Sequence, residues 1–358
     1  MIDSLYIHIP FCKKKCLYCD FNSFDNKSDL IDEYMDALKK EIGFYNLENL
    51  DTVYVGGGTP SFIDSKKIAE VLSIVPMARE LTIEMNPCTV TNDKLKDYKN
   101  AGVNRISMGL QTTKDNILKE IGRVHSFDDF KRAYEMIRKA GFSNVNVDLM
   151  FGLPSQSVED LMESVDYLIS INPEHISCYS LILHNDIFKH LPSDDDERKM
   201  YYYIKDKLKS AGYKHYEISN FAKEGFESKH NLAYWNQDEY AGVGAGASSY
   251  IDKIRYINEC DLKKYIELVD ENFSQRYMEE RQELEDTLRE YVILKLRLID
   301  GLNIQDTNFK FNIDFEDKFK NEIDTLRKSD LINISDGNLK LTDKGLDFAN
   351  VVWREFLE

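Results

Sequence analysis

Three cysteines within eight residues constrain this chain more than any other feature of its sequence. Cys12, Cys16 and Cys19 form a C-x₃-C-x₂-C pattern in a loop that follows the β-type run 5–9. The chain has six cysteines, and the other three are scattered, so we expect those to be small buried residues and not parts of a disulfide framework. Three thiolates can hold three irons of a [4Fe–4S] cluster and leave the fourth iron open. The pattern therefore predicts an iron–sulfur site.

Structural zinc is the alternative for the same cysteines. Zinc needs four ligands, and His8, which lies four residues before Cys12, is a candidate for the fourth. In a strand over residues 5–9, however, His8 and Tyr6 share one face, and the apolar residues between them share the other. We therefore expect His8 to face the interior of the fold, which favours the iron–sulfur interpretation.

Short β-type runs alternate with helical stretches between residues 4 and 216, which is typical of βα units around a parallel sheet. The number of units favours an α/β fold with a partial or full (β/α) barrel over a single doubly wound sheet. Ser126 and Ser157 each precede an aspartate three residues later, as in capping boxes, and predict two helix starts. The expected strands are 5–9, 52–55, 81–85, 105–108, 145–149 and 175–179.

The alternation of β-type runs with helical stretches ends after residue 220. We predict a barrel domain over 1–220, a connecting segment over 221–279 and a smaller helical, winged-helix-like module over 280–358. In that module a long amphipathic helix is expected from Glu280, and a hairpin is expected to turn at Asp336 and Gly337.

The chain carries 63 acidic and 46 basic side chains, so its net charge is −17. This sign argues against nucleic acid as the main partner and against adsorption to an anionic membrane by charge alone. No apolar stretch reaches the length of a membrane span, and the first residues lack the features of a secretory signal. We therefore expect a cytoplasmic protein.

Glycines and polar residues mark the ends of several expected strands. Gly56, Gly57 and Gly58 follow the second strand, where the lack of side chains lets a ligand's ammonium group approach backbone carbonyls. A phosphate-binding P-loop is excluded because no Gly-Lys-Ser/Thr follows. Carboxylates can accept ribose hydroxyls, and arginine can bind a carboxylate through two hydrogen bonds. Side chains suited to these tasks lie near the carboxyl ends of strands, where βα barrels bind ligands: Glu84, Gln111, Arg123 and Asp148.

With these features the chain resembles the radical S-adenosylmethionine (SAM) superfamily, in which a C-x₃-C-x₂-C loop and a glycine-rich second strand recur. The resemblance implies a radical SAM barrel and a [4Fe–4S] cluster held by Cys12, Cys16 and Cys19. It also implies that the amine and carboxylate of SAM chelate the open iron and that the glycine triplet holds the SAM ammonium.

Within the superfamily, the motifs are similar to those of one branch, which contains oxygen-independent coproporphyrinogen III dehydrogenases and haem chaperones of the HemW type. The similarity covers nearly the whole chain. The motifs are Tyr6-Ile-His-Ile-Pro-Phe-Cys12, Gly56-Gly-Gly-Thr-Pro-Ser61, Glu84-Met-Asn-Pro87, Ser107-Met-Gly-Leu-Gln111, Gly122-Arg-Val-His125 and Asp148-Leu-Met-Phe-Gly-Leu-Pro154.

Carried over position by position, the branch implies two sets of SAM contacts. Tyr6, Gly57 and Glu84 match contacts to the SAM on the cluster. Whether a second SAM binds to this chain stays open. The positions that touch a second SAM in the dehydrogenases are matched here by Tyr18, Gly58, Thr59, Gln111, Arg123 and Asp148.

Three differences separate the two kinds of protein within the branch, and all favour the chaperones. Phe21 stands where the dehydrogenases carry a fourth cysteine, and eleven residues precede Cys12 where they carry a longer extension. The stretch Lys229-His230-Asn231-Leu-Ala-Tyr234-Trp235 matches the H-N-x-x-Y-W signature of HemW proteins. Neutral imidazole is a good axial ligand of haem iron, so His230 is a candidate haem ligand, with a buried core histidine as the alternative.

The resemblance therefore implies a haem chaperone that binds a [4Fe–4S] cluster, SAM and haem as cargo, and that passes haem to proteins of the respiratory chain. The alternative is an enzyme, an oxygen-independent coproporphyrinogen III dehydrogenase, and a zinc-stabilised binding module is a third hypothesis. Lys13, Lys14 and Lys15 are candidates for docking a flavodoxin-type reductant. The family pattern implies a homodimer, and any contact with the inner membrane would be peripheral and made through a partner.

Overall fold

Six parallel strands form the centre of the structure, a computed structural model that describes residues 2–182, 187–270 and 276–357. They lie side by side in chain order and confirm all six strands expected from the sequence. These strands are β1 (Ser4–Ile9), β2 (Leu50–Gly57), β3 (Ala78–Met85), β4 (Arg105–Gln111), β5 (Val145–Phe151) and β6 (His175–Ser180).

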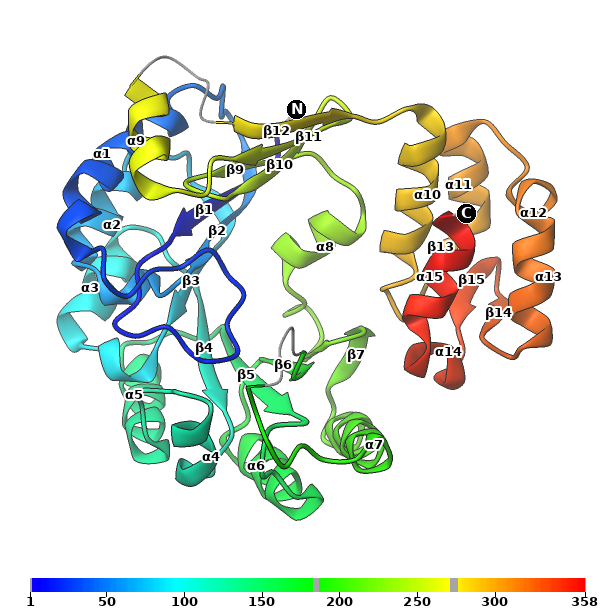
Figure 1. Ribbon diagram of the computed structural model, residues 1–358, viewed down its shortest axis with the longest axis horizontal. Helices are drawn as coiled ribbons and strands as arrows, with labels where there is room; N and C mark the ends of the chain where they lie inside the picture. Colours follow the sequence, from blue (N-terminus) through cyan, green and yellow to red (C-terminus); the bar gives the residue numbers. More distant parts are fainter. Residues whose placement is uncertain (1, 183–186, 271–275, 358) are drawn as a thin grey trace.

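The outer face of these strands packs against helices (Figure 1). Ser126 and Ser157 form the expected capping boxes, and Gly141 ends a helix in the left-handed region with φ of +82°. In β1, Leu5, Ile7 and Ile9 are fully buried among the apolar side chains of the main core. The helices are α1 (Ile31–Ile42), α2 (Ser65–Leu72), α3 (Asn92–Asn100), α4 (Asp115–Glu120), α5 (Phe127–Lys139), α6 (Val158–Ile171) and α7 (Asp194–Ser210).

Antiparallel strands extend the parallel sheet at both ends. Between β6 and the C-terminal module, β8 pairs with β6, and β9 returns to pair with β1 in parallel. The two terminal strands of the sheet, β12 and β7, do not pair with each other in the described part of the chain, so the barrel is partial. The added strands are β7 (Lys214–Glu217), β8 (Asn220–Ala222), β9 (Tyr240–Val243), β10 (Ser248–Ile251), β11 (Ile254–Asn258) and β12 (Arg276–Arg281).

Much of segment 221–279, expected as a connection, thus contributes strands to the main sheet, while the domain boundaries at 220 and 280 stay a prediction. The segment also holds α8 (Lys229–Trp235) and α9 (Leu262–Asp270). Figure 1 shows the sheet curved like a C, with α8 in its opening on the side of the C-terminal module.

The C-terminal module has a hydrophobic core of its own, separate from that of the barrel. The expected hairpin turns at Asp336 and Gly337, both with positive φ. The helix expected from Glu280 begins instead at Leu284, because the chain up to Arg281 pairs with β11 and Glu283 caps the helix. The elements of the C-terminal module are α10 (Leu284–Lys295), β13 (Leu302–Asn303), α11 (Ile304–Phe311), α12 (Phe315–Lys318), α13 (Lys320–Lys328), β14 (Ile332–Ser335), β15 (Asn338–Leu341), α14 (Asp343–Asp347) and α15 (Ala349–Leu357).

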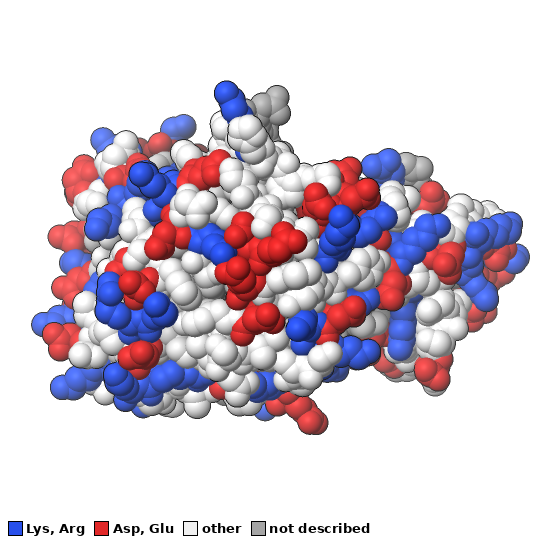
Figure 2. All heavy atoms as spheres, turned by 90° about the horizontal axis from the view of Figure 1, so that it is seen from below, with Lys and Arg blue, Asp and Glu red and all other residues white. Residues whose placement is uncertain are grey.

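The surface mixes charges of both signs. Figure 2 shows acidic and basic side chains interspersed on the face seen from below, without the continuous basic area that nucleic-acid binding requires. In the described ranges, no helix combines the length and apolar character needed to cross a bilayer.

Candidate functional site

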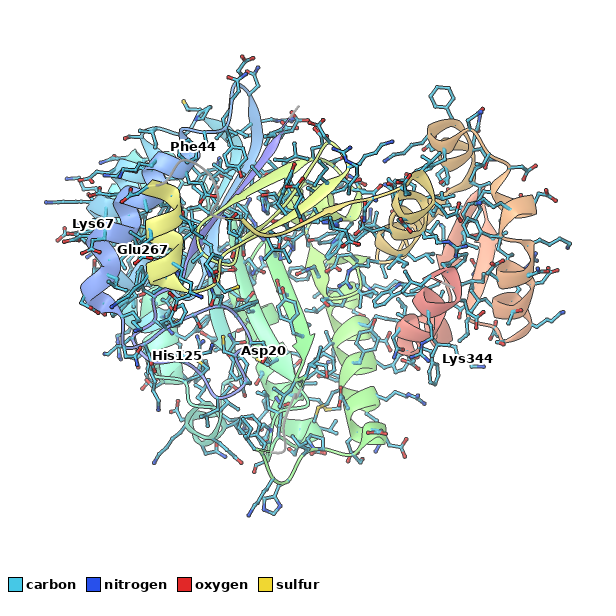
Figure 3. All side chains as sticks on the ribbon, turned by 45° about the horizontal axis from the view of Figure 1, so that its top comes forward. Asp20, Phe44, Lys67, His125, Glu267 and Lys344 are labelled. Atoms are coloured by element: carbon cyan, nitrogen blue, oxygen red, sulfur yellow. The ribbon has the colours of Figure 1, made fainter. Side chains whose placement is uncertain are left out.

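The carboxyl ends of the parallel strands surround a cavity of about 400 Å³. The loop that follows β1 passes across these strand ends, and Figure 3 labels Asp20 on it. The inner face of a βα barrel is usually filled with branched apolar side chains. Here polar side chains such as Ser107, Asn146 and Ser177 line the cavity, so the inside of the barrel stays partly open.

Eleven residues predicted for the site line this one cavity. They come from the loop after β1, the end of β2 and the later strands, so the fold gathers residues that are far apart in the sequence. They are Cys12, Cys16, Tyr18, Cys19, Gly57, Gly58, Thr59, Glu84, Gln111, Arg123 and Asp148.

The thiols of Cys12, Cys16 and Cys19 face the cavity from the loop after β1. Cys12 Sγ lies 3.4 Å from Thr59 Oγ1, and Arg123 Nη1 donates to Cys16 Sγ at 3.7 Å. Burial raises the pKa of the Cys12 and Cys19 thiols, which favours the protonated thiols when no metal is bound. Of the other cysteines, only Cys178 is buried as expected, because Cys88 and Cys260 lie on exposed segments.

The zinc alternative depends on a fourth ligand, because a structural zinc ion needs four. His8, the fourth zinc ligand considered above, is hydrogen-bonded through Nδ1 to Tyr6 Oη and through Nε2 to the carbonyl oxygen of Asn22. Both ring nitrogens are thus engaged away from the thiols.

Two contacts hold the cysteine loop in place from outside the cavity. The backbone of Phe24 pairs with the loop at Pro10 and Cys12. Asn22 Nδ2 donates to the carbonyl oxygens of Ala245 and Cys260, both at 3.0 Å. A Cβ atom at Gly246 would lie 2.7 Å from Asn22 Nδ2, so the glycine-rich turn after β9 supports the loop through close backbone approach.

The glycine triplet at the end of β2 lies directly under the cysteine loop. A Cβ atom at Gly58 would lie 3.0 Å from Cys12 Sγ, and one at Gly57 would lie 2.6 Å from the His8 ring. Gly57 also has φ of +114°, which other residues rarely adopt. Gly57 and Gly58 line the cavity, so their lack of side chains serves both the packing of the loop and the space beside it.

Two carboxylates lie inside the barrel, Glu84 on β3 and Asp148 on β5, with β4 between these strands. Glu84 accepts hydrogen bonds from Tyr54 Oη at 2.8 Å and from the Gly57 amide at 3.1 Å. Burial is the main cause that raises the pKa of Glu84 to about 7, and burial also raises the pKa of Asp148. Asn146 Nδ2 donates to Asp148 Oδ1 at 2.7 Å. Both acids can therefore accept hydrogen bonds from a polar or cationic ligand.

Arg123 and Gln111 complete the polar wall. Arg123 Nη2 donates to the carbonyl oxygen of Gly109 at 3.4 Å, and Nε donates to His125 Nδ1 at 3.3 Å. His125, labelled in Figure 3, is a buried residue of the loop before α5. Gln111 sits in the left-handed region with φ of +69°, beside a register irregularity in β4, and this bend turns its side chain toward the cavity.

Tyr6 and His230 lie outside the cavity lining in the described structure. His230 on α8 is 1% exposed and is hydrogen-bonded through Nδ1 to Thr52 Oγ1 at 2.7 Å and through Nε2 to Tyr234 Oη at 2.8 Å. Burial lowers its pKa to about 3, so the ring is neutral. As a haem ligand, His230 would have to give up one of these hydrogen bonds, and its surroundings are those of the alternative, a buried core histidine.

Sequence reasoning missed several residues of the cavity, most notably Arg105 and Asn146. Both share a strand face with a predicted residue, because side chains two positions apart in a strand point the same way. Counting back in steps of two from the strand-end residues Gln111 and Asp148 would have reached them. The prediction stopped at the strand ends, where ligands are expected.

Comparisons with known proteins agree with this geometry. Residues 6–168 match the model of the radical SAM superfamily, and residues 282–348 match that of the HemN C-terminal domain. The haem chaperone HemW of Bacillus subtilis is 38% identical over 375 residues, covering 99% of both chains. HemW of Lactococcus lactis is 36% identical over 99% of this chain and 97% of its own. The solved structure of coproporphyrinogen III oxidase (HemN) from Escherichia coli superposes with a TM-score of 0.88 at 24% identity, covering 99% of this chain and 89% of that one, and shows the same fold.

Proposed function

Because the chain belongs to the HemW family of haem chaperones, we propose that it binds haem and passes it to proteins that require haem. The observation that carries this proposal is the end-to-end similarity to HemW proteins, which extends over both the barrel and the C-terminal module. Proteins of the respiratory chain are the proposed acceptors.

The chain binds a [4Fe–4S] cluster and SAM, the cofactors of the radical SAM superfamily. We assign Cys12, Cys16 and Cys19 as the cluster ligands, supported by their common place on the cavity wall. When bound, the cluster supplies an open iron for SAM and one electron for its reductive cleavage. The protein's part is to hold the thiolates apart on one loop and to keep the bound groups out of bulk water.

We assign the SAM contacts to the residues that share the cavity with the thiols. Gly57 and Glu84 are the proposed contacts to SAM at the cluster, with the Glu84 carboxylate accepting from a polar group of SAM. Tyr6 remains a candidate that would need a side-chain movement, since its hydroxyl is hydrogen-bonded to His8. A second SAM would contact Tyr18, Gly58, Thr59, Gln111, Arg123 and Asp148.

The remaining partners are proposals of the same kind. Lys13 and Lys14 are exposed beside the cluster ligands, which suits docking of an acidic flavodoxin-type reductant. We further propose a homodimer that works in the cytoplasm and contacts the inner membrane at most through its haem acceptor.

Haem titration of oxygen-protected protein tests the function. We expect a shifted Soret band on binding, and its absence would refute the chaperone. Comparing His230→Ala with His175→Ala tests His230 as a ligand, because both are buried histidines with two hydrogen-bonded nitrogens. A change in the Soret band in the first variant alone would support the ligand role.

The same preparation tests the alternative enzyme. Incubation with a reductant, SAM and coproporphyrinogen III is expected to give no protoporphyrinogen. Stoichiometric protoporphyrinogen would replace the chaperone function by that of a dehydrogenase.

A further inference from the structure

Arg105 is a buried cation that faces the cavity with few partners. It is the first residue of β4 and is 2% exposed. In the part of the chain that the structure describes, its guanidinium makes one long hydrogen bond, from Nη1 to Thr82 Oγ1 at 3.4 Å, and no ion pair, and its buried Nε has no partner. A guanidinium removed from water in this way destabilises the fold unless another group pairs with it.

The two carboxylates whose pKa values are affected by the charge of Arg105 already accept other hydrogen bonds. Glu84 accepts from Tyr54 and Gly57, and Asp148 accepts from Asn146. In the sheet register, Glu84 lies two positions and Asp148 four positions nearer the carboxyl edge than Arg105. The charge of Arg105 partly offsets the rise in the pKa of both carboxylates, but neither carboxylate lies at ion-pair distance from Arg105 in the described chain. Within the described chain, the cavity lining therefore includes a cation without an ion pair.

The histidines near Arg105 do not compete for an anion. Burial, with the charge of Arg105 as the second cause, lowers the pKa of His175 and His230. Both rings are neutral at physiological pH, and each nitrogen already has a hydrogen-bonding partner. Unlike these two histidines, Arg105 is positively charged at physiological pH.

The exposed part of the cavity lining carries large apolar side chains beside the charged residues Lys14 and Asp20. Phe21 is 66% exposed and Ile182 is 69% exposed, and both line the cavity together with Met150 and Leu181. Exposed large apolar side chains around a cavity mark a place where an apolar ligand binds. A ligand that matches both these side chains and Arg105 has an apolar body and a carboxylate that reaches inward.

We infer that Arg105 binds a ligand carboxylate inside the cavity, while the exposed apolar side chains of the lining hold the apolar body of the same ligand. This inference rests on the proposed function, since haem joins a flat apolar ring to propionate groups, and it names a haem propionate as the carboxylate. Arginine suits this role because its planar guanidinium binds a carboxylate through two parallel hydrogen bonds. SAM also carries a carboxylate, so the test separates the two sources.

The test compares ferric haem with its dimethyl ester, which lacks the free carboxylates, on cluster-loaded protein without added SAM, because the SAM contacts assigned above line the same cavity. We expect wild type to bind haem about tenfold or more tightly than the ester, as a charge-assisted pair predicts. Arg105→Met should bind both equally, and Arg105→Lys should keep part of the difference. Arg297→Met is the control for the loss of an arginine outside the cavity lining, because Arg297 packs between Trp235 and Trp353. Arg297 lies 3.9 Å from Glu217, so its loss is expected to lower stability but to leave the preference for haem over the ester unchanged.

A second measurement separates ligand binding from a structural role. If Arg105 serves a ligand, the melting temperature of Arg105→Met without ligands should stay level or rise, because a poorly paired buried charge is removed. A lower melting temperature together with an unchanged preference for haem over the ester would overturn the inference. If Arg105→Met does not fold, Arg105→Lys carries the same comparison.

The remaining outcomes are distinct. Weaker SAM binding by Arg105→Met with unchanged haem binding would overturn the assignment of a haem propionate to Arg105. The carboxylate bound by Arg105 would then be that of SAM. Equal binding of haem and its ester by wild type would overturn the inference while leaving the chaperone function intact. If wild type binds neither porphyrin, the proposed function itself fails, and the haem assignment falls with it.

Discussion

The core of the C-terminal module and the inside of the barrel are both buried, but they bury different side chains. In the module, Phe315, Phe319 and Phe356 are at most 1% exposed and pack with other apolar residues. In the barrel, Arg105 is 2% exposed and has no ion pair in the described chain. Buried polar groups weaken a fold unless they are paired, so stability alone accounts for the module and not for the barrel. Ligand binding gives the reason for the barrel's interior, and the predictions below test this contrast.

The largest effect is expected from Cys16→Ala. Removing one thiolate leaves an iron without a protein ligand, so we expect oxygen-protected protein to lose nearly all its iron and sulfide. Cys88→Ala is the control, because Cys88 is exposed and lies outside the cavity lining. Iron analysis and visible absorption measure both variants. Full iron in Cys16→Ala would show that the loop after β1 does not hold the cluster.

Phe319→Ala should act in the opposite way, on stability and not on cofactors. Phe319 is 1% exposed and packs against Phe315 and Phe356 at ring distances of 5.0 and 5.5 Å. Truncating such a side chain costs about 3–5 kcal/mol of unfolding free energy. Denaturation followed by circular dichroism measures this loss. Because the core of the module is separate from that of the barrel, iron content should stay at the wild-type level, and a parallel loss of iron would contradict the separation.

How far the sequence predicts this structure depends on how local each signal is. The six strands and the capping boxes at Ser126 and Ser157 follow from short-range periodicity, and the structure has them all. The cavity lining at Glu84, Gln111 and Asp148 was also predictable, because the carboxyl ends of parallel strands meet at one edge.

Long-range contacts were not predictable in the same way. No local pattern indicates that β9 pairs with β1, which lies more than 200 residues earlier, or that α8 buries His230 against Thr52. The helix expected from Glu280 illustrates the same limit, since pairing of Arg276–Arg281 with β11 overrides local helical preference. Arg105 was missed because a charged residue at the start of a strand usually lies at the surface.

Glu84→Gln should raise stability at high pH. In the folded protein the pKa of Glu84 is raised to about 7, mainly by burial, from an ordinary value of 4.5. As pH rises from 4.5 to 7, the unfolded chain loses this proton first, so wild-type stability falls by up to about 3 kcal/mol and then levels off. The variant cannot ionise there and should lack this fall.

Chemical denaturation of protein without ligands at pH 5 and pH 8 measures the difference. Glu84→Gln and wild type should agree at pH 5, and the variant should be the more stable of the two at pH 8. SAM affinity should fall in the same variant, because the carboxylate acceptor is gone. A variant less stable than wild type at pH 8 would place Glu84 among the stabilising groups and weaken the contrast with the module.

The smallest effect is expected from Asn22→Ala, a substitution at a half-buried position of the cysteine loop. Its side chain donates to the carbonyls of Ala245 and Cys260 and so ties the cysteine loop to the turn after β9. Losing these hydrogen bonds should lower stability by about 1–2 kcal/mol. Asn46→Ala is the control, because Asn46 makes an exposed local contact with Glu48.

The decisive readout for Asn22→Ala is the rate at which the cluster bleaches in air. If the turn after β9 positions the loop, the cluster of Asn22→Ala should bleach several times faster than that of Asn46→Ala, while the melting temperature of Asn22→Ala falls by only a few degrees. Equal rates would mean that the backbone pairing of Phe24 with Pro10 and Cys12 suffices to hold the loop. The glycines after β9 would then serve packing alone, as the apolar side chains of the module do.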